Sequence, residues 1–203
     1  MSRKAVAPAA RGLTPSQTVG PYFAYALTPA KYRLKPIIAD DLVTPDAEGE
    51  RIRIEGRVLD ADGKPVSDAL IEIWQADGKG RYPAAGSARS NAAFKGFGRA
   101  ASNGDGRYAF ATVKPGPVPG PNRTMQAPHV SVSVLARGVL KRLHTRIYFD
   151  GEPGNARDPI LALVPASRRA TLIAKRAEAT GAMPCYVLDI RLQGSGETVF
   201  FAS

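Results

Sequence analysis

The chain of 203 residues is long enough for one domain whose core needs no disulfide or structural metal. Its single cysteine, Cys185, excludes an internal disulfide and suits a buried apolar position. The formal charge of +10 favours an anionic partner: a nucleic acid, a membrane surface, an acidic subunit or a small carboxylate substrate. Because no apolar run could span a bilayer and the first residues lack the apolar segment of a signal peptide, we expect a cytoplasmic protein without a membrane partner.

The first quarter of the chain lacks a regular period. Residues 1–12 are basic and rich in alanine, with nothing to pack, and predict a mobile tail. Residues 13–50 are interrupted by prolines and glycines and predict an extended arm and loops, with a short helical turn near residues 31–35. The acids of this segment fit no calcium-loop spacing, so we interpret them as solvated: Asp40, Asp41, Asp46 and Glu48.

From residue 51 onward, short runs of alternating or β-branched residues predict strands separated by glycine-containing turns. One strand begins at Leu70, and residues 186–192 and 198–201 predict a C-terminal hairpin. The other expected strands cover residues 51–58, 107–113, 129–135 and 143–149.

One short helix is predicted near residues 167–179, with Ser167 as its N-cap and Gly181 as its stop. Seventeen prolines and twenty glycines among short apolar runs favour many turns. Together with the short strands, they predict an all-β fold, a β-sandwich with long loops that occupies residues 51–203.

The segment at residues 70–82 contains the single tryptophan, Trp74. Its strand runs into the turn Asp77-Gly78-Lys79-Gly80 and delivers Tyr82 on the far side. Such a tyrosine can complete a corner of the core or offer a phenol oxygen to a metal, and the segment alone leaves both interpretations open.

The two histidines, His129 and His144, do not have zinc-ligand spacing with the one cysteine. In the strand that begins at His129, that residue and Ser131 share one face, so the second position of an H-x-H metal pair is occupied by a poor ligand. No G-x-S-x-G motif supports a serine hydrolase. We interpret His129 as a hydrogen-bonded residue at the edge of its strand.

Three motifs taken together resemble the intradiol ring-cleavage dioxygenases. Members of this family have a strand ending in Trp-Gln-Ala before a Gly-Arg-Tyr, a Lys-Pro-Gly-Pro loop and a Pro-Ala-His-x-His strand. The resemblance extends from Thr14 to Phe201, and the joint spacing of the motifs makes it specific. The corresponding residues here are Trp74-Gln75-Ala76 with Gly80-Arg81-Tyr82, Lys114-Pro115-Gly116-Pro117, and Ala127-Pro128-His129-Val130-Ser131.

The resemblance implies a β-sandwich and, in catalytic members, Fe(III) held by two tyrosines and two histidines. By this resemblance Tyr82 and His129 match one ligand of each kind, whereas Val118 and Ser131 stand at the other two positions. Gln126 stands where catalytic chains have an arginine near the substrate. The four iron-site positions are therefore expected to be vestigial, with no metal and no catalytic residue in this chain.

What the resemblance then implies is a non-catalytic alpha subunit whose iron-bearing partner, a beta subunit, holds the Fe(III). We expect a hetero-oligomer of several alpha–beta pairs and no nucleic-acid partner. Its small aromatic acid substrate would be protocatechuate, cleaved by O₂ between its two hydroxyls to 3-carboxy-cis,cis-muconate.

The same resemblance assigns substrate contacts to Thr18, Gly20 and Pro21 of the arm and to Arg137. An arginine at a strand end more commonly forms a solvated or interfacial salt bridge, so both roles for Arg137 remain open. Eight residues of strand separate Arg137 from His129 by more than roughly 20 Å, so these two cannot serve one small pocket.

The alternative is a basic β-sandwich module that binds nucleic acid or protein without an enzymatic role. It depends on charge alone, because the basic residues are dispersed and do not form an aromatic-rich basic strand of the RNA-binding kind. We interpret the cations without a role as solvated faces or contacts to an acidic partner: Arg142, Arg146, Arg168, Arg169, Lys175 and Arg176.

Overall fold

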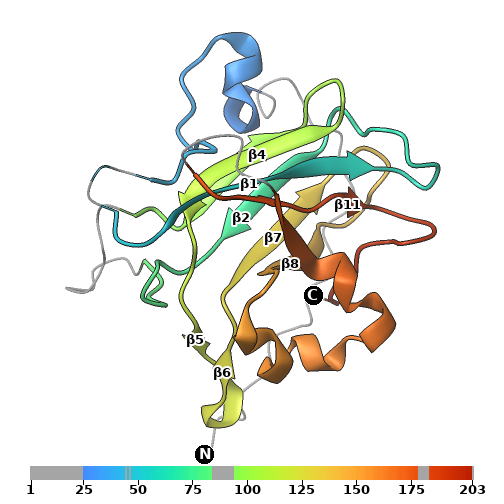
Figure 1. The fold of residues 1–203 in the computed structure, drawn as a ribbon. Coiled ribbons are helices and arrows are strands. Elements are labelled where there is room, and N and C mark those ends of the chain that lie inside the picture. The colour runs from blue at the N-terminus through green and yellow to red at the C-terminus, as the bar shows by residue number, and fades with distance from the viewer. Residues whose placement is uncertain (1–24, 44, 46, 84–93, 178–182, 203) are drawn as a thin grey trace, which may run out of the picture.

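The computed structural model describes residues 25–43, 45, 47–83, 94–177 and 183–202. Within these ranges, nine strands form one sheet in the order β11-β1-β10-β9-β8-β7-β2-β3, with β4 paired to β1, and β5 pairs separately with β6 (Figure 1). The strands are β1 (Arg51–Leu59), β2 (Leu70–Trp74), β3 (Phe97–Ala101), β4 (Arg107–Val113), β5 (Val118–Pro119), β6 (Met125–Gln126), β7 (His129–Leu135), β8 (Leu143–Phe149), β9 (Ile173–Ala177), β10 (Cys185–Val187) and β11 (Ile190–Arg191). The 3-10 helices are η1 (Pro29–Tyr32), η2 (Pro121–Arg123), η3 (Pro153–Arg157), η4 (Leu161–Leu163) and η5 (Ala166–Leu172).

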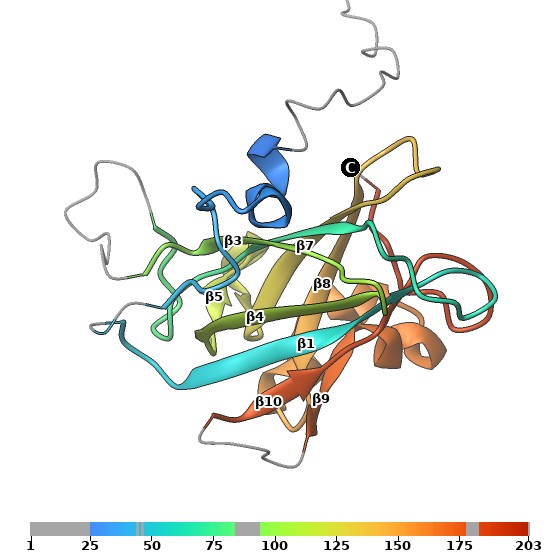
Figure 2. The same ribbon diagram turned by 90° about the horizontal axis from the view of Figure 1, so that it is seen from above.

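The long sheet curls, so that β1 and β4 lie over β2, β7 and β8 as two layers (Figures 1 and 2). One buried cluster fills the space between them, with Ile54 and Phe110 from one layer and Val132 and Ile147 from the other. These four side chains are no more than 1% exposed. The predicted all-β, sandwich-like fold is confirmed.

Three predicted strands, 107–113, 129–135 and 143–149, match β4, β7 and β8 in their bounds, and β1 extends one residue beyond its prediction. In β7 the alternation places Val130, Val132 and Val134 in the core, as expected from a period of two. Cys185 is buried and free, which agrees with an apolar role for this thiol. The helical turn expected near residues 31–35 occurs slightly earlier, as η1.

The helix predicted near residues 167–179 is wrong in length and type. Its first part forms the 3-10 helix η5, whose N-cap is Pro165 and not Ser167. The chain then becomes strand β9, which pairs in parallel with β8 and antiparallel with β10. Tertiary pairing overrides the local helical pattern here, because β9 is the only link between β8 and β10 among the described strands. Gly181, the expected stop, lies outside the described residues.

The prediction of a C-terminal hairpin at residues 186–192 and 198–201 is also wrong. The segment at residues 186–192 divides into β10 and β11, which pair in parallel with different parts of β1. The segment at residues 198–201 is not a strand. Thr198 exchanges two bonds with Arg191, and a bridge joins Phe201 to His144. Val199 is held by the side chains of Thr145 and Thr171. Strand β3 was missed because its sequence, Phe-Gly-Arg-Ala-Ala, has low strand propensity and forms only against β2.

The described residues before β1 contain a helical segment at residues 25–27, η1 and irregular loops, and the loops run beside β4 and β3 (Figure 2). The tail predicted at residues 1–12 lies outside the described part, and the division of the chain at residues 13–50 and 51–203 stays a prediction. Among the described helices we find none with the length and apolarity to cross a lipid bilayer.

Within the described residues, the same five-residue turn occurs three times. In each copy a side-chain Oδ1 of the first residue accepts the backbone N–H groups of the third and fifth residues at 2.9–3.0 Å. The fourth residue is glycine with a positive φ of 71–79°, a conformation that other residues adopt at a cost. The first residues are Asp60, Asp77 and Asn103, and the glycines are Gly63, Gly80 and Gly106. The turn that leads to Tyr82 is therefore a recurring structural motif of this fold and is not by itself a sign of a metal site.

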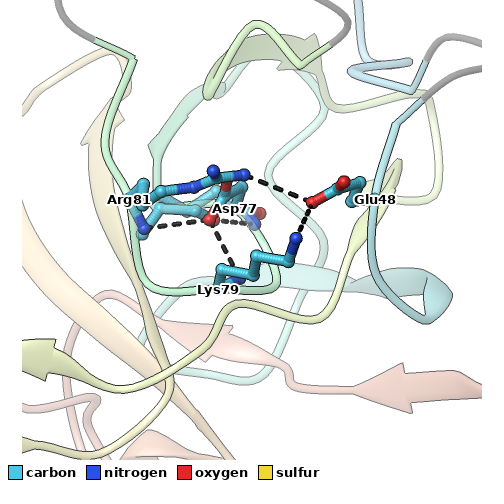
Figure 3. Close-up of polar contacts among 6 residues, drawn as sticks. Glu48, Asp77, Lys79 and Arg81 are labelled. Atoms are coloured by element: carbon cyan, nitrogen blue, oxygen red, sulfur yellow. Dashed lines mark hydrogen bonds and ion pairs between the residues drawn. The ribbon is translucent and has the colours of Figure 1, made fainter. Parts of the chain in front are cut away.

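The copy at residues 77–81 differs because its first carboxylate is buried. Asp77 is 1% exposed, and its Oδ2 accepts a hydrogen bond from the Nε of Arg81 at 2.8 Å. Glu48 then lies 2.6 Å from the Lys79 amine and 3.3 Å from Arg81 Nη2, which ties the turn to the loop before β1 (Figure 3). Burial by itself raises the pKa of the Asp77 carboxyl, but its bonds from Arg81 and from the backbone of Arg81 and Lys79 prevail and lower that pKa.

The same turn is pressed against the loop that leads into β5. The Gly116 N–H donates to Asp77 O at 2.9 Å, and a Cβ added to Gly80 would lie 2.1 Å from Pro117 O. A Cβ on Gly116 would lie 2.7 Å from Gly78 O. These backbones can touch because both loops have glycine at the contact, and the contact fixes the segments that carry Tyr82 and Val118.

Replacing Asp77 with asparagine removes the charge that pairs with Arg81. We expect a loss of about 1–2 kcal/mol of unfolding free energy near pH 7, since Arg81 is 41% exposed and water screens the pair. The Asp77 pKa is lowered in the folded state, so this stability is present above the unfolded value of about 4 and is lost as the pH falls through the folded pKa.

The difference between wild type and Asp77→Asn should therefore be constant from about pH 7 to 5 and shrink below about pH 4. Urea unfolding across this range measures it. The matched control is Asp105→Asn, which changes an exposed acid in the turn at residues 103–107. Equal stability of the two variants at pH 7 would contradict the role given to Asp77.

Candidate functional site

Tyr82 and Ser131 lie beside the tryptophan that ends β2. Trp74 pairs with Ser131 in the register between β2 and β7. Its ring stacks on that of Tyr82, with centroids 5.7 Å apart and 14° between the planes. Both rings remain more than a third exposed, at 39% and 37%. Tyr82 is thus held by an aromatic stack at the edge of the sheet.

Val118 and His129 are both buried, at 3% exposed each. Val118 begins β5 and pairs with Gln126 of β6. His129 begins β7, which lies inside the sheet, and its Nδ1 is 2.7 Å from Ala127 O. The prediction that His129 is hydrogen-bonded is confirmed, but its strand is central and not at an edge.

Arg146 of β8 connects these positions. It stands opposite Ser131 in the register between β7 and β8. Its Nη1 donates to Gln126 Oε1 at 2.7 Å and lies 3.4 Å from the Tyr148 hydroxyl. That hydroxyl donates to the buried Asp158 at 3.0 Å. We call the following residues the Arg146 cluster: Tyr82, Gln126, His129, Ser131, Arg146 and Tyr148.

The electrostatics of the cluster follow from burial and from this one cation. Burial raises the pKa of Tyr82 more than Arg146 lowers it, so the phenol keeps its proton at neutral pH. Burial and then Arg146 lower the pKa of His129, despite the opposing effects of Ala127 O and Asp158. Burial also raises the pKa of Tyr148. The cluster therefore contains two neutral phenols, a neutral imidazole and a guanidinium.

These residues do not fit ferric iron. Fe(III) requires hard anionic donors, whereas Val118 has no donor atom and Ser131 offers a neutral hydroxyl. Arg146 adds a positive charge that acts on both Tyr82 and His129, and a second cation there would be repelled. In the part of the chain that the structure describes, no three His, Cys, Asp or Glu side chains are grouped as a metal site.

Arg137 lies apart from this cluster, in the turn beyond the last residue of β7, whereas His129 is the first residue of that strand. Its side chain is 76% exposed, with Nε 3.3 Å from Asp68 Oδ2. It also lines a hollow of about 310 Å³ together with residues of the turn at 60–64 and of the chain after β11. The arm residues Thr18, Gly20 and Pro21 lie outside the described residues.

The sequence did not reveal Arg146, which we had grouped with the solvated cations. One signal was available: alternation along β8 puts Arg146 and Tyr148 on one face and the buried Thr145 and Ile147 on the other. What could not be read was the register that sets Arg146 against Ser131, because pairing depends on the whole sheet.

Comparison with known proteins agrees with this architecture. The pattern of the Dioxygenase family matches residues 18–194. The alpha chain of protocatechuate 3,4-dioxygenase from Burkholderia cepacia is 47% identical over 193 residues, which cover 93% of this chain and 96% of that relative. The beta chain from the same organism is 39% identical over 158 residues, which cover 74% of this chain and 67% of the beta chain.

A solved structure leads to the same family. The dioxygenase domain of a dioxygenase–carbohydrate-binding fusion protein from Streptomyces sp. SirexAA-E superposes with a TM-score of 0.61 at 28% identity, covering 90% of this chain and 99% of that domain. The family pattern, the relatives and the fold agree, and the chain belongs to the intradiol ring-cleavage dioxygenase family.

Proposed function

We propose that this chain is the non-catalytic alpha subunit of a protocatechuate 3,4-dioxygenase. It assembles with an iron-bearing beta subunit into a hetero-oligomer of alpha–beta pairs. In the shared pocket, protocatechuate is cleaved by O₂ between its hydroxyls to 3-carboxy-cis,cis-muconate. The single observation that carries this proposal is the set of residues at the four iron-site positions, where Tyr82 and His129 are accompanied by the buried Val118 and by Ser131, with the Arg146 guanidinium opposite Ser131.

Similarity to an alpha chain over nearly the full length of both proteins supports the subunit assignment. Intradiol dioxygenases depend on iron, and this chain lacks a fitting donor set among the residues described. Fe(III) therefore belongs to the beta subunit in this proposal, and Tyr82, Val118, His129 and Ser131 are vestigial positions of an iron site. The cost of such a change is small, because Trp74 stacking and strand pairing hold these positions without a metal.

The alpha subunit contributes to the partner's pocket through Arg137 and through Thr18, Gly20 and Pro21 of the extended arm. An exposed guanidinium is suited to a carboxylate because it presents N–H groups in a planar fork. Its distance from the Arg146 cluster, at the other end of β7, supports two separate roles. The arm and the sandwich domain, residues 13–50 and 51–203, then serve different purposes in the assembly.

The purified single chain should not retain Fe(III). We expect far less than one iron per chain by elemental analysis, none of the burgundy phenolate-to-iron charge-transfer colour, and an unchanged melting temperature after treatment with a chelator. The co-expressed complex with a beta subunit is the positive control. Stoichiometric iron with that colour in the single chain would overturn the assignment.

The variant Arg137→Ala in the assembled complex should raise the KM for protocatechuate by about 10-fold or more, since a hydrogen bond between charged groups contributes about 1.5–3 kcal/mol. The iron content should stay that of the wild-type complex. Arg142→Ala, in the nearby loop before β8, is the matched control. If steady-state kinetics give the same KM for Arg137→Ala as for wild type, Arg137 does not bind the substrate.

A further inference from the structure

Arg137 is held by a carboxylate whose position is set by the sheet. Strands β2 and β7 pair so that Leu70 stands opposite Leu135. Extended by two residues, this register sets Asp68 opposite Arg137, and their side chains form an ion pair with Nε 3.3 Å from Oδ2. The contact is thus a cross-strand pair beyond the last paired residues, where opposite charges stabilise each other.

Both ends of the pair have a fixed backbone. The residue after Asp68, Ala69, is buried, and its N–H donates at 2.9 Å to the hydroxyl of Ser102, itself 0% exposed. Ser102 N–H donates back to Ala69 O at 2.8 Å. On the other side, the turn after β7 is closed by a bond from Val139 N to Ala136 O at 3.2 Å. The backbone of Asp68 is therefore fixed, and its carboxylate can hold the long and otherwise exposed side chain of Arg137 in one position.

The guanidinium needs such a reference because its long side chain is 76% exposed. It borders a hollow of about 310 Å³ that is also lined by Asp60, whose Oδ1 already accepts two backbone N–H groups of its own turn. A guanidinium carries five N–H donors, and Asp68 engages the Nε side. Among the described residues the terminal Nη1 and Nη2 groups have no other acidic partner, and they can receive a second carboxylate as a bidentate pair.

We propose that Asp68 is a positioning residue, which holds the Nε of Arg137 so that its terminal fork faces the substrate carboxylate. This inference deepens the proposed function and rests on the role of Arg137 given there. Asp68 does not touch the substrate and acts through Arg137 alone. It is a specificity device, because it matters only for a substrate that carries a carboxylate.

The test uses Asp68→Asn in the assembled alpha–beta complex at about 0.15 M salt, where distant charges are screened. Positioning predicts that KM for protocatechuate rises about 2- to 5-fold, the scale of one exposed ion pair, with kcat nearly unchanged. A pure charge effect has the opposite sign, because removing an acid makes the site more attractive to an anion. A KM that falls or stays the same therefore overturns the proposal.

Four further measurements exclude a merely structural effect. Asp68→Asn should not change KM for catechol, which lacks the carboxylate, and Asp68→Glu should restore part of the loss. Adding Asp68→Asn to Arg137→Ala should cause no further change, since two residues that act through one contact are not additive. Asp62→Asn, which removes an acid of the neighbouring turn that pairs with Lys64, should behave as wild type.

The outcomes separate this inference from the proposed function. If Arg137→Ala raises KM and Asp68→Asn does not, Arg137 binds the substrate without help from Asp68. If Arg137→Ala itself leaves KM unchanged, the substrate role of Arg137 fails first. Additive losses in the double variant would show that Asp68 acts by another route.

Discussion

The contact between two glycine-containing loops is the constraint on which the candidate site depends. The turn at residues 77–81 and the loop at residues 114–117 touch backbone to backbone, with Gly116 N bonded to Asp77 O and no room for a Cβ at Gly80. The buried Asp77 carboxylate holds the turn from inside, and Glu48 ties it to the chain before β1. A framework built in this way keeps the segments of Tyr82 and Val118 adjacent whatever the chemistry of their side chains.

Because of this independence, these positions keep their arrangement without a metal. Tyr82 is stacked on Trp74, and His129 is bonded to a backbone carbonyl, so neither needs a metal to be held. Arg146 supplies positive charge in the same region and donates to Gln126 and to Tyr148, whose hydroxyl donates in turn to Asp158. The buried polar members, His129 and Tyr148, each have a hydrogen-bond partner, as buried polar groups require.

Many of the basic side chains form ion pairs with acidic residues of the same chain. Many cations in the described part are paired with acids across strands or turns, as in Arg57 with Asp189, Arg99 with Glu72 and Lys114 with Glu152. Such pairing fixes the positions of long side chains on the sheet and its turns. Arg137 and Asp68 follow the same rule at the end of β7, where the geometry of one guanidinium decides how it meets another carboxylate.

Sequence alone determined the fold class, the bounds of β4, β7 and β8, and the buried valines of β7, because alternation and turn residues are local signals. It also indicated the protein family, because the motifs and their spacing can be read directly from the sequence. It could not determine β9 or β3, since Ile173–Ala177 has a helical pattern and Phe97–Ala101 has low strand propensity until the sheet pairs them. Nor could it find Arg146 opposite Ser131 or Asp68 opposite Arg137. Those contacts join residues far apart in the chain, and only the register of the folded sheet sets which of them meet.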